Sequence, residues 1–140
     1  MQNKKILFTI MLLATVVLGT SIVSAGLFDS SNSNNDIVVE NITIDSEGYS
    51  MYKVGADIIP KKDFSYLEMQ VIFYDSSDAV IGKSSLAWNV DNPVKDQKIK
   101  ASGSAFTDDA SSKPARAEVY IVDSALGKPD DALFVQNVTM

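Results

Sequence analysis

Two side chains that carry much enzyme chemistry are missing from this chain. The sequence contains no histidine and no cysteine, which removes the commonest general base, the thiol nucleophile and the usual zinc ligands. Residues 50–53 (SMYK) match the S-x-x-K spacing of serine enzymes with a lysine base. The partner motifs S-D-N and K-T-G are absent, and Ser50 opens a predicted strand, where positions i and i+3 point to opposite faces. We therefore expect no enzyme, no catalytic residue and no cofactor.

Carboxylates are the remaining candidates for catalysis or metal binding. Paired aspartates occur at three places: Asp75 with Asp78, Asp108 with Asp109, and Asp130 with Asp131. Two carboxylates can hydrolyse a glycoside or bind calcium, and Asp75 with Asp78 would be the first pair to examine for calcium. The calcium-loop pattern is absent, however, and aspartate is common in turns because its side chain accepts hydrogen bonds from nearby backbone groups. We predict turns here and no metal site; a carboxylate-dependent hydrolase is the least favoured alternative.

Aromatic side chains suggest binding instead of catalysis. Tyr66, Ile72 and Tyr74 share one face of a predicted strand, and Trp88 follows on the next strand. Aromatic rings on a sheet face can stack on sugars or anchor a protein partner. We take Tyr66, Tyr74 and Trp88 as the candidate binding face. The alternative is that these rings pack within the sheet as cross-strand pairs.

Two sequons add a modification chemistry. Asn41 and Asn137 each begin an N-x-T triplet, which is an N-glycosylation acceptor in a host that modifies exported proteins. Asn41 lies on the polar side of its predicted strand with Thr43, which suits a glycan. The predicted face of Asn137 also carries Leu133 and Val135.

The elements that must position these residues are strands. In residues 66–82 (YLEMQVIFYDSSDAVIG), Leu67 and Phe73 alternate with Glu68 and Gln70, which predicts one buried and one wetter face. The run stops at residues 75–78 (DSSD) and resumes at Ala79. This pattern is typical of a β-hairpin.

Further short strands are predicted on both sides of the hairpin. They cover residues 37–44 with Val38, Ile42 and Ile44 on one face, 49–59, 85–90 with Leu86 and Trp88 inward, 97–106, 115–122 and 132–139. Turns and loops separate them, and no longer window after residue 25 shows a helical period. The strand count predicts an all-β fold, an immunoglobulin-like antiparallel β-sandwich of about seven strands. A small closed barrel is the alternative.

The N-terminus has the layout of a secretory signal peptide. Lys4 and Lys5 precede an apolar run at residues 6–19, and small residues lead to Ala25. A bilayer-spanning helix needs about 20 apolar residues, so an uncleaved anchor is the less favoured interpretation. We predict a signal peptide at 1–25, a Ser/Asn-rich flexible tether at 26–36 and a β-sandwich domain at 37–140. A secreted or cell-surface location follows, with N-terminal membrane anchoring as the alternative.

Charge limits the partners. Lys4 and Lys5 are two of the 12 basic residues, so the processed chain would keep 10 against 18 acidic residues, a net charge of −8. Nucleic-acid binding depends on basic side chains that neutralise phosphates, and anionic lipid headgroups likewise attract basic clusters. We expect no nucleic acid, and contact with a membrane only through an uncleaved N-terminal segment. With no cysteine, the exported domain has only its core to hold it together.

The hairpin resembles a known family at residues 71–75 (VIFYD). This stretch is similar to the Phe-x-Leu-Tyr-Asp motif of the small exported FxLYD domains, with Val71 in place of the first aromatic residue and Phe73 in place of leucine. Asp78 stands where that family commonly has glycine. The resemblance implies an immunoglobulin-like domain at the cell surface, and it transfers no catalytic residues. We therefore expect a non-catalytic module that binds an envelope protein or glycan, and a carbohydrate-binding domain is the main alternative.

Overall fold

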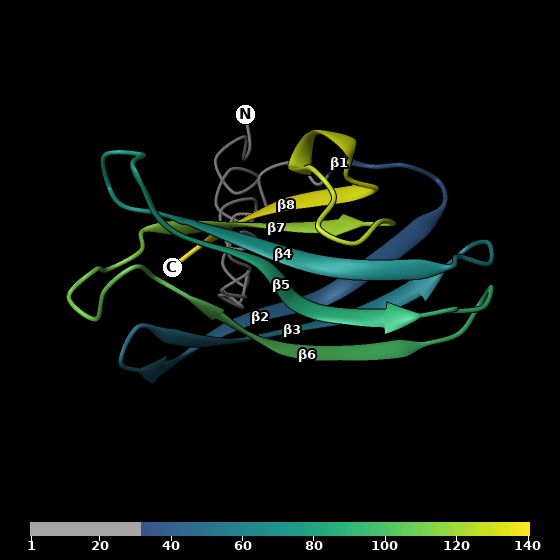
Figure 1. The fold of residues 1–140 in the computed structure, drawn as a ribbon, viewed down its shortest axis with the longest axis horizontal. Helices are drawn as coiled ribbons and strands as arrows, with labels where there is room; N and C mark the ends of the chain where they lie inside the picture. Colours follow the sequence, from purple (N-terminus) through teal and green to yellow (C-terminus); the bar gives the residue numbers. More distant parts are fainter. Residues whose placement is uncertain (1–31) are drawn as a thin grey trace, which may run out of the picture.

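The computed structural model describes residues 32–140, which form a two-layered β-sandwich (Figure 1). The predicted signal peptide and residues 26–31 of the predicted tether lie outside the described residues. The strands and the single 3-10 turn are β1 (Asn32–Ser33), β2 (Ile37–Gly48), β3 (Met51–Pro60), β4 (Tyr66–Tyr74), β5 (Val80–Asp91), β6 (Ile99–Phe106), β7 (Arg116–Val122), η1 (Pro129–Asp131) and β8 (Phe134–Thr139). No helix within this part of the chain has the length and apolar character needed to cross a membrane.

The order of the strands is that of an immunoglobulin-like sandwich. One sheet has the order β2-β3-β6 and the other has the order β1-β8-β7-β4-β5, with antiparallel pairing throughout. Chain connections therefore pass back and forth between the two sheets, as they do in immunoglobulin-type folds. Seven strands have six residues or more. The predicted fold class and strand number are confirmed.

The sandwich begins a few residues before Ile37. Asn32 and Ser33 pair with β8, and the Asn34 backbone nitrogen donates to the Leu133 carbonyl over 3.0 Å. The Lys61 nitrogen donates to the Asp36 carbonyl over 2.8 Å. Residues 32–36, which fall within the predicted tether, are thus hydrogen-bonded to the sandwich.

The predicted central hairpin is formed by β4 and β5. Its turn is organised by Asp75, whose Oδ1 accepts hydrogen bonds from the Ser77 nitrogen, the Ser77 hydroxyl and the Ala79 nitrogen. Asp78 has φ +63°, a left-handed backbone conformation. Aspartate is one of the few residues other than glycine that tolerate this conformation, so the turn forms without a glycine.

A β-bulge in β2 changes which of its residues face the core. Between the Glu40 and Thr43 pairings the register shifts, and Asn41 within this step has φ +54°. An extra residue reverses the alternation of a strand. Ile42 and Ile44 therefore pack against the core together with Val39, whereas Val38 does not. The prediction that Val38 shares their face was wrong because strict alternation cannot anticipate the bulge.

A second irregularity turns Leu86 outward. The β4–β5 register shifts between Met69 and Val71, and Leu86 lies in the extra segment of β5. Ala87 is buried in place of Leu86, which is 55% exposed. The predicted inward position of Leu86 was wrong because residues 85–87 of β5 lie opposite the single residue Gln70 of β4, which strict alternation cannot anticipate. Trp88 does pack against the core.

The core lies between the two sheets and is contributed by nearly every strand. Its completely buried apolar residues are Val54, Ile58, Leu67, Met69, Val71, Phe73, Ala105, Ala117, Val119 and Ile121. Burying a large aliphatic or aromatic side chain contributes about 1.5–3 kcal/mol, and this packing has to hold a chain that has no disulfide. The two sheets approach closely where β5 passes β6, since a Cβ on Gly103 would lie only 1.8 Å from the Ala87 carbonyl oxygen.

Candidate functional site

The predicted binding tyrosines lie on the outer face of the larger sheet. Tyr66 and Tyr74 project from β4 on the side opposite the buried Leu67 and Phe73. The pairing of β4 with β7 and β8 brings further polar residues onto this face. We call this surface the tyrosine face; it comprises Tyr66, Glu68, Gln70, Tyr74, Arg116, Glu118, Tyr120 and Asn137.

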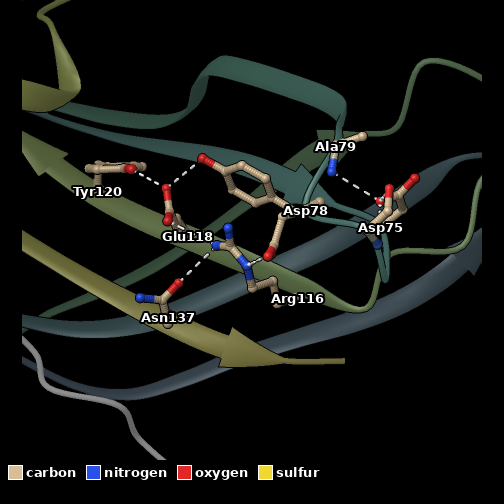
Figure 2. Close-up of polar contacts among 9 residues, drawn as sticks. Asp75, Asp78, Ala79, Arg116, Glu118, Tyr120 and Asn137 are labelled. Atoms are coloured by element: carbon tan, nitrogen blue, oxygen red, sulfur yellow. Dashed lines mark hydrogen bonds and ion pairs between the residues drawn. The ribbon is translucent and has the colours of Figure 1, made fainter.

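Glu118 is the centre of the first polar cluster on this face. Its Oε2 accepts a hydrogen bond from the Tyr74 hydroxyl over 2.7 Å and another from the Tyr120 hydroxyl. Its Oε1 accepts from the Arg116 Nη1 over 2.9 Å. Figure 2 shows Glu118 between Tyr120 and Arg116. All these donors come from β4 and β7, so the carboxylate ties the two strands together.

Arg116 links this cluster to its surroundings. Its Nε donates to Asp78 of the β4–β5 turn over 2.9 Å, and its Nη1 also donates to the Asn137 side chain on β8 over 3.1 Å (Figure 2). The guanidinium carbon lies 3.7 Å from the centre of the Tyr74 ring, a cation–π arrangement. Arg116 therefore covers one face of the ring that was expected to be available for a ligand.

The cluster shifts the acid–base properties of its members. Burial works to raise the pKa of Glu118, but the hydrogen bonds from Tyr120, Tyr74 and Arg116 together hold that pKa below its usual value. The pKa values of Tyr120 and Tyr74 are raised by burial and by their bonds to the same carboxylate. Glu118 is thus stabilised as an anion and both hydroxyls are stabilised as donors.

Glu68 is the centre of a second cluster, which lies under a loop. Its carboxylate accepts hydrogen bonds from the Tyr66 hydroxyl over 2.7 Å, the Gln70 side chain over 2.9 Å and the Leu126 backbone nitrogen over 3.1 Å. Gln70 also donates to the Gly127 carbonyl over 2.8 Å. Leu126 and Gly127 belong to the β7–β8 loop, which folds back over β4. Glu68 has 0% exposure as a result, so the prediction of a wetter face at Glu68 and Gln70 was wrong.

The position of Tyr66 in this second cluster raises its pKa. Burial, reinforced by the hydrogen bond to Glu68 and by its negative charge, raises the pKa of Tyr66 to about 12. The hydroxyl therefore stays protonated and keeps donating above pH 10, where an ordinary tyrosine ionises.

The three residues of the predicted binding face are not brought together. Trp88 pairs with the buried Met69 across β4 and β5 and packs against the core, so it points away from Tyr66 and Tyr74. The hydroxyls of Tyr66 and Tyr74 are bonded to carboxylates of the protein itself. The tyrosine face consequently offers less aromatic surface for stacking on a sugar than the sequence suggested.

The carboxylates of Asp75 and Asp109 each accept hydrogen bonds within their own turn, whereas the Asp78 carboxylate accepts from Arg116. Asp75 binds its own turn, and Asp109 accepts hydrogen bonds from Ser111 and Ser112 in the β6–β7 connection. Hydrogen bonds from Ser77 and Ala79 lower the pKa of Asp75, and those from Ser111 lower the pKa of Asp109. Asp130 and Asp131 lie in η1. Among the described residues no group of three or more acidic side chains is placed to hold a metal ion.

The two sequon asparagines are both hydrogen-bonded. The Asn41 side-chain nitrogen donates to Asp57 over 2.9 Å at the β2 bulge, and its side chain is exposed. This bond, working with the nearby Lys98 and Lys100 charges, lowers the pKa of Asp57. Asn137 accepts from Arg116 on the tyrosine face and is half-buried. Of the two, Asn41 has the more accessible side chain.

Sequence reasoning missed the most exposed aromatic residue of the described chain. Tyr49 was assigned to a strand, but Tyr49 and Ser50 form the two-residue turn between β2 and β3. The Tyr49 side chain is 94% exposed. A signal for this turn is present in the sequence: in residues 47–50 (EGYS), a glycine lies between two strand-like runs, and these runs pair with each other. Phe106, which is 48% exposed, lies at the same end of the sandwich on β6.

Comparison with known families and proteins adds no relative. No family model matches the chain, and no curated protein matches it. The resemblance of residues 71–75 to the FxLYD motif therefore remains a prediction from sequence.

Proposed function

We propose that this protein is a non-catalytic exported or cell-surface module that binds another protein of the cell envelope. We assign the contact to the β2–β3 turn instead of the tyrosine face. One observation carries it: Tyr49 is an almost fully exposed aromatic side chain, whereas the tyrosines of the sheet face are bonded to Glu68 and Glu118. Exposed aromatic residues are enriched among the anchors of protein interfaces.

Two further features support a binding role. The described strands hold loops at both ends of a rigid sandwich, the arrangement in which immunoglobulin-type domains present their binding residues. The polar groups of the tyrosine face are already paired with one another, so they stabilise the sheet and are not free for a partner. Export is supported by the signal-like pattern of residues 1–25 in the sequence.

Site-directed photo-crosslinking in the native host tests this function. A photoreactive amino acid replaces Tyr49 in one strain, Tyr74 in a second strain and Lys100, an exposed polar position of β6, in a control strain. We expect a protein adduct that is reproducible at position 49 and absent at position 100. A protein adduct formed from position 74 and not from position 49 would place the contact on the tyrosine face and overturn the assignment. The absence of any adduct at both positions 49 and 74 would overturn the protein-binding function.

A further inference from the structure

The β2–β3 turn has a backbone conformation that its residues disfavour. Gly48 pairs with Met51, and the two residues between them, Tyr49 and Ser50, have φ +50° and +66°. Positive φ at both central positions is what a type I′ turn requires, and such turns favour Asn-Gly or Asp-Gly. A residue with a Cβ is disfavoured there because the Cβ crowds the following carbonyl oxygen. The chain thus presents a tyrosine where asparagine would fold more readily.

Packing does not compensate for this strain, because the Tyr49 side chain is 94% exposed. Strained residues that gain nothing within the fold are found preferentially at functional sites. The observation at Tyr49 therefore points to a role outside the domain itself.

Other apolar residues lie at the same end of the sandwich. Phe106 is the Cα partner of Met51 across β3 and β6, and both occupy positions that alternate with the inward-facing Tyr52 and Ala105. The Thr107 nitrogen donates to the Ser50 carbonyl over 2.9 Å, which fixes the end of β6 against the turn. We call Tyr49, Met51 and Phe106 the hairpin-tip patch. In Figure 1 the β2–β3 turn and the β6–β7 connection project from the same end of the molecule.

Acidic side chains border this patch. Asp45 and Glu47 lie at the end of β2, and Asp108 and Asp109 follow Thr107, the first residue after β6. All four are exposed, and none takes part in an ion pair among the described residues. The exposed basic residues at this end are Lys53, the Cα partner of Asp45, Lys83, which follows the glycine packed against Phe106, and Lys113 of the β6–β7 connection. The four acidic side chains outnumber these three lysines, so the net charge at this end is negative, which attracts positive groups and disfavours a second copy of this chain.

From these observations we infer that the hairpin-tip patch binds a protein segment in which lysine or arginine side chains flank an apolar centre. Tyr49 and Phe106 contact the apolar centre, and the four carboxylates face the basic flanks. This inference rests on the proposed function, to which it adds the chemistry of the partner.

The test uses isotope-labelled full-length protein and three synthetic peptides. The probe has two leucines flanked on both sides by lysines; the controls carry glutamates in place of the lysines or serines in place of the leucines. We expect only the probe to shift the backbone NMR signals of Tyr49, Met51 and Phe106. Raising the salt from about 50 to about 300 mM should weaken its binding at least about tenfold, because exposed charges are screened.

A double variant separates folding from binding. Tyr49→Asn with Ser50→Gly supplies a favoured type I′ sequence, so we expect the Tm to rise by about 5 °C while binding of the probe falls at least about tenfold. The matched control is Leu86→Asn, which removes an exposed leucine from β5 and should leave probe binding unchanged.

The outcomes separate this inference from the function on which it rests. Equal binding of the glutamate peptide, or signal shifts confined to Tyr66 and Tyr74, would overturn the assigned partner chemistry or the assigned surface. If the probe fails to bind but the crosslink at position 49 persists in cells, the partner chemistry is wrong and the binding function stands. If the crosslink is also absent, the binding function at this end fails as well.

Discussion

The tyrosine face and the hairpin-tip patch both depend on tyrosine, and they use it in opposite ways. On the tyrosine face, Tyr66, Tyr74 and Tyr120 each donate to a carboxylate of the protein itself. In the hairpin-tip patch, Tyr49 is almost fully exposed and its backbone is left-handed. The difference teaches that an aromatic cluster on a sheet face is not by itself a binding site. Whether a tyrosine is available to bind a ligand depends on whether its ring and hydroxyl already have partners within the protein.

The largest effect on stability is expected from a substitution of Glu68, at the centre of the second cluster. Glu68→Ala leaves the Tyr66 hydroxyl, the Gln70 amide and the Leu126 nitrogen without their common acceptor in a buried position. We expect the free energy of unfolding to fall by about 3 kcal/mol. Urea denaturation measures this loss, and Glu40→Ala, at an exposed position of β2, is the control with an expected change within about 0.5 kcal/mol. A loss no larger than the control's would show that the second cluster contributes nothing.

Glu118 tests the first cluster and its dependence on pH. Because the pKa of Glu118 is lowered in the folded state, its contribution is present above the ordinary glutamate pKa and is lost as pH falls through the folded value. Glu118→Gln should destabilise the domain at pH 7 by about 1–2 kcal/mol. It should also flatten the acid limb of the stability curve below the ordinary pKa of 4.5. Denaturation midpoints at several acidic pH values give both results; parallel acid limbs for variant and wild type would contradict the assignment.

Tyr66 tests how the stability of the second cluster depends on alkaline pH. Its folded pKa of about 12 lies above the ordinary value of 10.0, so the folded state holds this proton more tightly. The contribution is complete below pH 10 and is lost as the pH rises through 12. Tyr66→Phe should lower stability at pH 7 by about 1 kcal/mol and reduce the alkaline loss.

The matched control for Tyr66→Phe is a substitution of Tyr49 in the hairpin-tip patch. Tyr49→Phe removes a hydroxyl from an exposed ring and should leave stability at pH 7 unchanged. If Tyr66→Phe and Tyr49→Phe have equal effects in thermal and urea denaturation, the contrast between the two regions does not hold.

The smallest effect on stability is expected at Leu126, a loop residue that resembles Tyr49 in its backbone conformation and exposure. Leu126 has φ +53° and is 69% exposed, like Tyr49, but its backbone nitrogen donates to Glu68. Leu126→Asn keeps that bond and suits the left-handed conformation, so stability should rise by about 0.5 kcal/mol. Leu86→Asn, at a position without a positive φ, should give no such gain in the thermal midpoint. A fall in stability for Leu126→Asn would mean that the leucine side chain holds the loop.

The sequence predicted the fold well wherever the alternation of residues was regular. Leu67 and Phe73 on β4, and Val54, Ala56 and Ile58 on β3, lie in the core as their spacing indicates. The predictions failed at bulges. Val38 was placed on the wrong face because one extra residue in β2 reverses the alternation of that strand. Leu86 was placed on the wrong face because it lies in a three-residue segment of β5 that is opposite a single residue of β4. No residue type in the sequence marks either irregularity.

The candidate site was predicted less completely than the fold. The sequence placed Tyr66 and Tyr74 together on one face, since both lie on β4 at even spacing. It could not show that Glu118 and Arg116, more than forty positions along the chain, would engage Tyr74. It also grouped Trp88 with the tyrosines, because the face of a residue on a neighbouring strand depends on register, and register is settled by the pairing of the strands.

By itself the sequence determined that this domain is a β-sandwich held without disulfides, since alternation and composition act locally along the chain. Only the tertiary structure decided which polar groups are already paired. Glu68 appears in the sequence as a solvent-facing carboxylate, yet the β7–β8 loop buries it with three donors. Tyr49 appears as the start of a strand, yet strand pairing makes it the exposed tip of a turn. Both outcomes arise from contacts between distant segments, which local patterns do not encode.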